Sequence, residues 1–322
     1  MKAWAKQVLA PAARFATRQC ARVIMYHRFT AGGAGGRLDV QVLDQQLRYL
    51  RRHYKVVSLH DVIVRLRSGM APEPYSVAVT VDDAYADFGD IAYPVFQRHG
   101  VPVTLYVVSE FAGGRMWLWW DMIRQILMSA PNGQYAPRSS SISLSDATSR
   151  ERAWQELAGV GLALSPGERQ GYIASLQAVF GVPLPGVPPR EFAALSWDEL
   201  RGLDPKLVDI GAHTRTHPIL SRCESPQIQE EVAGSKSEIE AALGREVRSF
   251  CYPNGTWSDV DARCLAAVRE AGYEGAVMAC GTLVCRGADV YALDRIGPSE
   301  KRDDFASEIS GISHIRRRAL KS

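Results

Sequence analysis

The sequence has no internal repeat, no low-complexity tract and only a small excess of positive charge. Its 322 residues carry a formal net charge of +3, and the lysines and arginines form no stripe with interleaved aromatic residues. Nucleic-acid binding depends on a concentrated basic surface, so we expect no nucleic-acid partner. Hydrophobic residues at 46% and charged residues at 23% are typical of a folded globular protein, and they exclude a largely disordered chain.

Closely spaced cysteine pairs, which frame small secreted domains or bind structural zinc, are also missing. The six cysteines are scattered along the chain, at Cys20, Cys223, Cys251, Cys264, Cys280 and Cys285. We expect them to be reduced and mostly buried thiols.

Long hydrophobic runs are absent from the first 20 residues, because Lys2, Lys6, Arg14 and Arg18 interrupt them. No apolar segment there is long enough for a secretion signal or a membrane span, and we expect a cytoplasmic protein. Residues 1–20 can instead form a basic amphipathic helix with four apolar residues on one face, Trp4, Val8, Leu9 and Phe15. Together with the basic tail at 311–322, this helix could bind an anionic surface peripherally at the inner membrane face; an ordinary solvated end is the alternative.

Short apolar runs rich in β-branched residues alternate with helix-period segments through most of the chain. This alternation predicts a sheet of mostly parallel strands joined by helices, as in an α/β barrel. The expected strands are 23–27, 56–59, 77–82, 103–108, 208–213, 249–252, 275–278 and 293–296. Several of them end in a polar residue, and reactive groups in such folds collect at the carboxyl ends of the strands.

Amphipathic helices are expected at 39–53, 226–243 and 259–271. Residues 113–190 break the alternation, with an aromatic cluster at their beginning and a proline-rich stretch at their end. We interpret this stretch as a helical insertion between two barrel strands rather than as a separate domain. The predicted barrel covers 21–310, with the basic segments 1–20 and 311–322 on either side.

Two histidines four residues apart, His213 and His217, directly follow an apolar strand. Imidazole is the commonest neutral metal ligand, and this spacing lets both rings face one ion. Pro218 argues against a helix, so the pair is expected at a strand end and in its loop. Taken alone, such a pair is equally compatible with a structural role.

Two adjacent carboxylates, Asp82 and Asp83, also follow an apolar strand. Neighbouring anions at the mouth of a sheet repel each other unless a cation lies beside them, although a helix cap or a turn is the alternative reading. Combined with the two histidines, they predict a catalytic metal site with one carboxylate and two imidazoles as ligands. The second carboxylate remains as a base.

With these residues the sequence resembles the polysaccharide deacetylases, known as carbohydrate esterase family 4 or the NodB homology group. The resemblance covers roughly residues 22–300 apart from the insertion, and it includes the segments 25–28 and 250–255. It implies a distorted, incomplete (β/α)7-8 TIM-like barrel. It also implies a hydrolase that removes N-acetyl groups from amino sugars of a polysaccharide, such as an exopolysaccharide, or of a lipid-linked glycan.

The family motifs carry over residue by residue onto this chain. They make Asp82 the general base, and Asp83, His213 and His217 the ligands of a divalent metal, with Zn²⁺ as the expected ion. The third motif places a backbone N–H donor for the oxyanion in the Pro253–Gly255 turn, which points to Asn254. Substrate contacts are expected from six aromatic or turn residues, Tyr85, Tyr252, Pro253, Trp117, Trp120 and Trp257, although each tryptophan could instead be a core residue.

Two motifs depart from the family pattern. Cys251 stands where the third motif often has an arginine, and Arg295 stands in the last motif, which usually offers a histidine as general acid. Arginine cannot donate a proton near neutrality, so we expect Arg295 to support Asp82 in place of the lost arginine. His27, at the end of the first strand, resembles the acid of the poly-N-acetylglucosamine deacetylase branch and is the candidate proton donor; a packing role is the alternative.

Two rival functions stay open, and the altered motifs favour only the first of them. One is a catalytically inactive relative that binds glycans, and the other is a zinc amidase that acts on a non-sugar amide. No protein partner can be inferred from the sequence.

Overall fold

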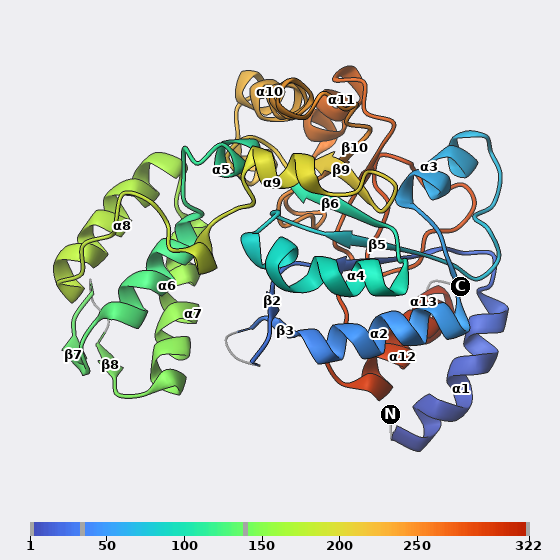
Figure 1. The fold of residues 1–322 in the computed structure, drawn as a ribbon, viewed down its shortest axis with the longest axis horizontal. Coiled ribbons are helices and arrows are strands. Elements are labelled where there is room, and N and C mark those ends of the chain that lie inside the picture. Colours follow the sequence, from blue (N-terminus) through green and yellow to red (C-terminus); the bar gives the residue numbers. More distant parts are fainter. Residues whose placement is uncertain (1–2, 33–35, 138–140, 320–322) are drawn as a thin grey trace. The chain divides into compact units, whose positions relative to one another are not determined.

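The computed structural model describes residues 3–32, 36–137 and 141–319, which divide into two compact units (Figure 1). The first, here called the barrel unit, comprises Met1–Gly113 and Ala194–Ser322. The second, here called the inserted unit, comprises Gly114–Ala193. Every residue predicted to bind the metal or to act in catalysis belongs to the barrel unit.

Seven strands among the described residues form one parallel sheet in the barrel unit. Its order is β1-β5-β6-β9-β10-β11, and β4 pairs with the start of β5. The bounds are β1 Arg22–Tyr26, β4 Lys55–Val56, β5 Ser76–Val81, β6 Val103–Val107, β9 Val208–Ala212, β10 Ser249–Cys251 and β11 Gly275–Val277. Every residue of β5 and β6 is buried, which explains why these strands read as continuous apolar runs.

Residues 293–296 connect the two ends of the sheet. Leu293 forms a parallel bridge with Val277 of β11, and Ile296 forms one with Ile24 of β1. The predicted strand at 293–296 is therefore reduced to a bridge at each of its ends. Because the segment touches both the first and the last strand, the sheet curves into a distorted, incomplete barrel, which confirms the predicted fold class.

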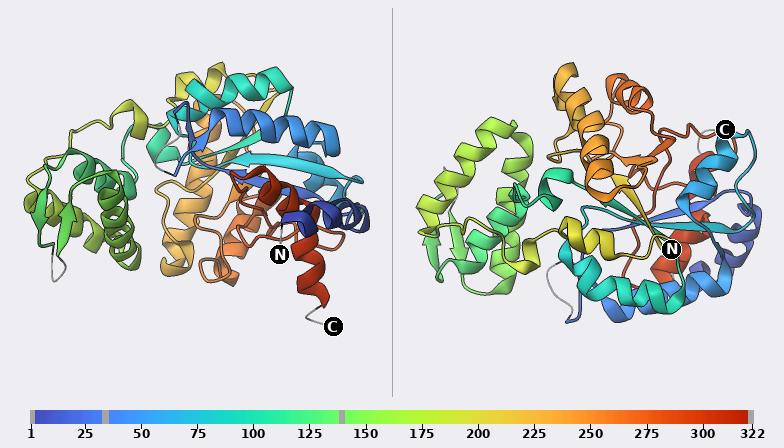
Figure 2. Two further views of the ribbon diagram at one scale, coloured as in Figure 1. Left: turned by 90° about the horizontal axis from the view of Figure 1, so that it is seen from below. Right: turned by 45° about the horizontal axis from the view of Figure 1, so that its top comes forward.

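Helices surround the sheet in the barrel unit, and Figure 2 shows them from two further sides. Their bounds are α1 Ala3–Ala16, α2 Val40–His53, α3 Leu59–Arg67, α4 Tyr93–His99, α5 Ser109–Ala112, α9 Trp197–Gly202, α10 Ser225–Leu243, α11 Ala262–Glu270, α12 Arg302–Ser310 and α13 Ile312–Ala319. Side chains cap α2 and α11 at their starts, where Asp39 and Asp261 accept backbone N–H groups. The predicted helices at 39–53, 226–243 and 259–271 match α2, α10 and α11 to within three residues at each end.

The predicted strand at 56–59 is too long, because β4 ends at Val56 and α3 begins at Leu59. Ser58 and Asp61 form a capping box: the N–H of Asp61 donates to Ser58 Oγ at 3.0 Å, and the N–H of Ser58 donates to Asp61 Oδ2 at 3.2 Å. This reciprocal cap fixes the first turn of the helix. The Ser-x-x-Asp pattern at 58–61 is the signal that the strand assignment overlooked.

The inserted unit leaves the barrel chain between β6 and β9. Its described residues form three α-helices, a two-stranded antiparallel ribbon and a short 3-10 helix, with bounds α6 Trp119–Ser129, α7 Ala147–Ala163, α8 Pro166–Phe180, β7 Gly133–Tyr135, β8 Ile142–Leu144 and η2 Arg190–Phe192. Ile126, Leu176 and Phe180 are among the residues buried in its own hydrophobic core. The segment is thus an insertion by sequence position, but it differs from our expectation because it forms a compact unit of its own.

Helix α1 packs against α12, and a buried arginine holds the chain that follows it. The guanidinium of Arg22 donates hydrogen bonds to the carbonyl oxygens of Thr17, Cys20, Ile309 and Ser310. The side chains of Trp4 and Val8 lie outside the described residues. Membrane binding through this segment stays a prediction.

Cys20 and Cys285 form a disulfide bond with an S–S distance of 2.06 Å, so the expectation of six reduced thiols is wrong for these two. They are 265 residues apart in the sequence, and spacing alone could not pair them. Cys223, Cys251 and Cys264 carry buried free thiols, and Cys280 a partly buried one.

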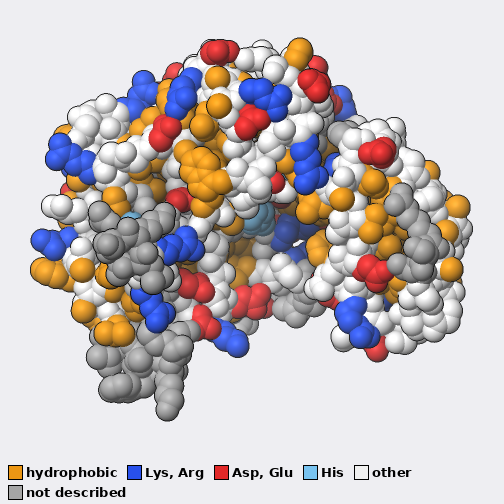
Figure 3. Space-filling model, turned by 180° about the vertical axis from the view of Figure 1, so that it is seen from behind, with side chains coloured by type: hydrophobic (Ala, Val, Ile, Leu, Met, Phe, Trp, Pro, Cys, Tyr) orange, Lys and Arg blue, Asp and Glu red, His pale blue; other side chains and the backbone are white. Residues whose placement is uncertain are grey.

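Basic and acidic side chains are interspersed on the face of the molecule that Figure 3 shows. None of the helices within the described ranges is long and apolar enough to span a membrane.

Candidate active site

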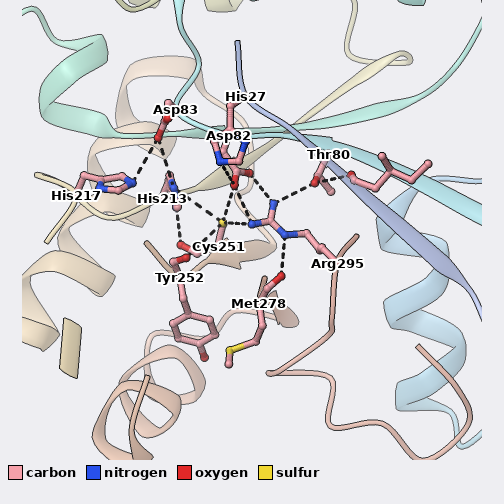
Figure 4. A network of polar contacts seen from close by, with 11 residues as sticks. His27, Thr80, Asp82, Asp83, His213, His217, Cys251, Tyr252, Met278 and Arg295 are labelled. Atoms are coloured by element: carbon pink, nitrogen blue, oxygen red, sulfur yellow. Dashed lines mark hydrogen bonds and ion pairs between the residues drawn. The ribbon is translucent and has the colours of Figure 1, made fainter. Parts of the chain in front are cut away.

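Two strand ends carry the predicted metal ligands. Asp82 and Asp83 follow β5, and His213 follows β9. Strand β6 lies between them in register, with Val81 beside Leu105 and Leu105 beside Ile210. Parallel strands end at the same edge of the sheet, so residues 130 positions apart in the chain become neighbours (213 − 83 = 130; Figure 4).

Three of these side chains converge on one point. Asp83 Oδ1 lies 3.5 Å from His213 Nε2 and 3.5 Å from His217 Nε2. The two imidazole rings stand nearly perpendicular, at an interplanar angle of 85°. Tetrahedral zinc has ligand bonds of about 2.0–2.1 Å, which places ligand atoms about 3.4 Å apart. Both distances from Asp83 match this spacing, and the three ligand atoms lie within 4.8 Å of one another, as a bound divalent metal requires.

The chemistry of these three groups fits a metal as well as their spacing does. Asp83 Oδ1 is buried and accepts no hydrogen bond from the described residues. His213 Nδ1 donates to the carbonyl oxygen of Cys251 at 2.7 Å, which leaves Nε2 unprotonated and facing Asp83. Burial lowers the pKa of His213 to about 4 and raises that of Asp83. A buried carboxylate oxygen beside the neutral imidazole of His213 and the imidazole of His217 is a donor set that a divalent cation would satisfy.

Asp82 makes a two-point ion pair with Arg295. Arg295 Nη1 donates to Asp82 Oδ1 at 2.6 Å and Nη2 donates to Oδ2 at 2.8 Å, and both side chains are almost fully buried. Thr80 Oγ1 and the carbonyl oxygen of Met278 accept further hydrogen bonds from the guanidinium. Burial alone would raise the pKa of Asp82, but the charges of Arg295 and His27 outweigh it and hold this pKa below its ordinary value. Arg295 thus lies where the sequence placed it, beside the predicted base.

Cys251 occupies the space between the base and the metal ligands. Its sulfur lies 3.1 Å from Arg295 Nη2, 3.6 Å from Asp82 Oδ2 and 4.0 Å from His213 Nε2. Burial raises the pKa of this thiol, which therefore stays neutral. The small side chain leaves room for the guanidinium of Arg295 to reach Asp82 from the opposite side of the site (Figure 4).

His27 lies at the end of β1, on the solvent side of Asp82. Its Nε2 is 3.5 Å from Asp82 Oδ2, and 45% of its side chain is exposed. The structure therefore brings together Asp82, Asp83, His213 and His217. Arg295 contacts Asp82 from the buried side, and His27 lies near Asp82 on the exposed side.

A glutamate that the sequence analysis missed holds the loop between the two histidines. Glu231 of α10 accepts hydrogen bonds from the backbone N–H groups of Arg215 and Thr216, both at 2.8 Å, and from the Thr216 hydroxyl. Thr214 Oγ1 accepts the N–H of His217 at 2.9 Å. Thr214 and His217 both have positive φ angles, of 66° and 57°, so the loop needs such support.

Glu231 is 5% exposed, and burial raises its pKa although its hydrogen bonds oppose that rise. A signal for it was present in the sequence. Glu231 falls on the same face of the predicted helix as Ile228 and Val232, where an acidic residue needs an explanation.

Two of the predicted substrate contacts do not fit their positions. Tyr85 is 1% exposed and lies beneath the guanidinium of Arg28, which sits 3.6 Å from the ring centroid. The ring of Tyr252 is also 1% exposed, and its hydroxyl donates to the carbonyl oxygen of Tyr291. Both rings are core residues of the barrel unit, and Figure 4 shows Tyr252 pointing away from the metal ligands. These two assignments are therefore corrected: neither side chain is open to a sugar.

The backbone N–H of Asn254, in the turn after β10, is the predicted donor to the oxyanion. Asn254 and Gly255 have φ angles of 57° and 69°, and the N–H of Gly255 is taken by the carbonyl oxygen of Pro253. Among the described residues, the N–H of Asn254 has no acceptor. Pro253 itself is buried.

The predicted tryptophan contacts differ in exposure. Trp257 follows the turn with 62% of its surface exposed. Trp117 is 7% exposed and Trp120 partly buried, and both belong to the inserted unit. Sugar stacking by these tryptophans stays a prediction.

Comparison with known proteins supports the resemblance seen in the sequence. Residues 186–276 match the family model described as polysaccharide deacetylase. YxkH of Bacillus subtilis (strain 168), a protein named provisionally as a polysaccharide deacetylase, is 22% identical over 105 residues. That match covers 32% of this chain and 37% of the relative.

Two solved structures share the fold over most of the chain. The Streptococcus pyogenes deacetylase PplD in complex with acetate has a TM-score of 0.57 at 17% identity, and the match covers 88% of this chain and 93% of that one. IcaB from Ammonifex degensii has a TM-score of 0.59 at 16% identity, and the match covers 90% and 97%. The family model thus supports the resemblance to polysaccharide deacetylases over residues 186–276, and the two solved structures confirm the predicted fold.

Proposed function

We propose that this protein is a metal-dependent hydrolase that removes N-acetyl groups from the amino sugars of a polysaccharide or lipid-linked glycan. One observation carries the proposal: Asp83 Oδ1 lies 3.5 Å from Nε2 of both His213 and His217, while a second carboxylate, Asp82, remains beside them. Three ligands with an adjacent base form the arrangement of hydrolytic metal sites, in which a coordination position stays open. The family-model match at residues 186–276 and the deacetylases among the structural neighbours support the choice of an acetyl group.

Asp83, His213 and His217 would hold the metal, for which Zn²⁺ is the best match to one oxygen and two nitrogen donors. When bound, such an ion supplies Lewis-acid chemistry, which polarises a carbonyl group and makes water more acidic. His213 is already neutral and oriented through its Nδ1 hydrogen bond. The protein therefore needs to displace no proton from His213 to bind the ion near neutral pH.

Asp82 is the general base of the proposed reaction. It takes a proton from the attacking water, and its low pKa keeps it unprotonated and ready. Arg295 fixes the orientation of the carboxylate through two hydrogen bonds. Arg295 acts through Asp82 and is a positioning residue.

His27 is the proposed proton donor to the leaving amine, which departs poorly without a proton. It sits on the exposed side of Asp82 and can exchange protons with solvent. The backbone N–H of Asn254 is the proposed donor to the oxyanion of the tetrahedral intermediate.

Acetate release from an N-acetylglucosamine oligomer tests the proposed function. The metal-loaded protein should release acetate, a chelator should abolish release, and added Zn²⁺ should restore it. The His213→Ala variant serves as the matched control and should release none. Binding of the oligomer without acetate release would instead indicate an inactive glycan-binding relative. Turnover of cyclic ureides or imides, but not of acetylated glycans, would indicate an amidase.

A further inference from the structure

Cys20, Cys285 and His314 form a second cluster of metal-ligating side chains in the barrel unit. One ligand atom from each lies within 4.8 Å of the others, and all three residues are partly buried. They come from three separate parts of the chain: the segment after α1, the loop after β11 and helix α13. None of the three has a role in the proposed hydrolysis.

The backbone holds the two cysteines side by side independently of their sulfurs. Ala21 and Val284, their immediate neighbours, form an antiparallel bridge with N–H···O distances of 2.7 and 3.0 Å. The cysteines therefore stay adjacent when the bond between their sulfurs is broken. This backbone pairing makes the site preorganised in its reduced form.

His314 is oriented as a metal ligand. Its Nδ1 is 2.9 Å from Thr282 Oγ1, and its Nε2 faces Cys285 Sγ at 3.7 Å. When Nδ1–H donates to the threonine hydroxyl, the lone pair of Nε2 points at the sulfur, which is the usual arrangement for a ligating histidine. Zinc bonds of about 2.3 Å to sulfur and about 2.0–2.1 Å to nitrogen place these two atoms about 3.6 Å apart in a tetrahedral site. The observed distance matches that spacing.

We propose that, in the reduced protein, Cys20, Cys285 and His314 bind a thiophilic divalent cation such as Zn²⁺. A small-molecule dithiol would first reduce the disulfide: it gives two electrons and two protons to the cysteines and becomes a cyclic disulfide itself. Each thiol then loses its proton to solvent as its sulfur bonds to the ion, so two protons leave per ion bound. A water molecule completes the coordination. The bound ion would replace the disulfide in tying the two distant segments together, and it would add α13 to the link.

Cobalt binding tests this site because thiolate ligands give Co²⁺ a charge-transfer absorption in the near ultraviolet. The His213→Ala variant is used as the background, so that the candidate catalytic centre does not contribute. After reduction and removal of the dithiol, this protein should bind Co²⁺ with the thiolate absorption, and the oxidised protein should not. Absence of the absorption from the reduced protein would overturn the proposal.

Further variants on the same background locate the site. Cys285→Ser should lose the absorption, whereas Cys280→Ser, which removes a partly buried thiol elsewhere, should keep it. Thr282→Val should weaken Co²⁺ binding by about tenfold, because it removes the partner of the ligand histidine. If Cys285→Ser keeps the absorption, another thiol binds the metal and the proposed site is wrong.

X-ray absorption at the zinc edge provides a second test that needs no variant. The wild-type protein loaded with Zn²⁺ should show sulfur neighbours in the reduced state that are missing in the oxidised state. Identical nitrogen and oxygen coordination in both states would reject the site even if the cysteine variants failed to fold.

Discussion

The guanidinium of Arg295 and the carboxylate of Asp82 form a bidentate ion pair in which neither side chain is more than 2% exposed. Burying two charges is costly, and their attraction together with the added bonds to Thr80 and Met278 offsets that cost. The pair therefore fixes both the position and the ionisation of the proposed base. It is the part of the site where stability and reactivity depend on the same contact.

Replacing Arg295 by methionine should raise the pKa of Asp82, because burial remains while the neighbouring positive charge is lost. A base with a higher pKa is protonated at higher pH, so the acid limb of the kcat/KM profile should move upward in pH. Breaking a buried pair should also reduce the free energy of unfolding by about 3–5 kcal/mol. Urea unfolding and a pH series of acetate release measure the two effects. The exposed Arg48→Met variant should show neither, and an unmoved acid limb in the Arg295 variant would refute the proposed support of the base.

The Asp82→Asn variant should keep its metal and lose turnover. Asparagine has nearly the same shape but cannot accept the proton from water, and such general-base steps are worth about 10²–10⁴-fold in rate. Metal content and acetate release are measured together, with circular dichroism to show that the protein folds around an unpaired Arg295. His213→Ala should instead lose both metal and turnover. Substantial turnover by Asp82→Asn would remove Asp82 from its proposed role.

The His27→Gln variant should lower kcat while metal content stays unchanged. His27 makes no contact expected of a metal ligand, and it is exposed enough for a small molecule to reach its position. Added imidazole should therefore restore part of the rate. His60→Gln, on α3, is the matched control and should behave as the wild type. A variant with full activity would assign His27 to packing.

Removing the carboxylate of Glu231 should weaken metal binding without touching any ligand. Glu231→Ala leaves two backbone N–H groups of the histidine loop without their acceptor, and loss of such outer contacts typically costs about 10–100-fold in metal affinity. Glu231→Gln keeps one accepting oxygen and should lie between Ala and the wild type. At saturating Zn²⁺ the kcat of both variants should recover most of its value, which a general folding defect would not allow.

Glu230 provides a control for the Glu231 variants. It is the neighbouring residue, is mostly exposed and pairs with the Arg215 side chain instead of the loop backbone. Glu230→Gln should leave metal affinity unchanged. Equal losses in the Glu230 and Glu231 variants would point to the overall charge of α10 rather than to support of the loop.

Sequence reasoning could bring the candidate metal ligands together because each pair is local. Asp82 and Asp83 are adjacent, and His213 and His217 share one loop, so only the meeting of the two pairs had to be inferred. The position of Arg295 beside Asp82 was inferred from two motifs: the third has Cys251 where an arginine is usual, and the last has Arg295 where a histidine is usual. These inferences needed no knowledge of side-chain packing.

Side-chain packing determines which residues near the motifs are buried and which distant residues pair, and the sequence alone does not show either. Tyr85 and Tyr252 lie next to motif residues, yet their rings point into the core, and a sequence position does not specify on which side of a loop a ring falls. The disulfide joins residues from opposite ends of the chain through the bridge between Ala21 and Val284. Such pairs become visible only when the curvature of the sheet is known.

Strand β6 contributes none of the proposed ligands, yet it separates the two strands that do. Asp83 and the histidines can meet only after β6 has been inserted between β5 and β9, so a partly assembled sheet has no place for the ion. We therefore expect the proposed ion to bind only when β5, β6 and β9 have paired. An ion bound at this position would stabilise the pairing of β5, β6 and β9, in addition to its part in the proposed hydrolysis.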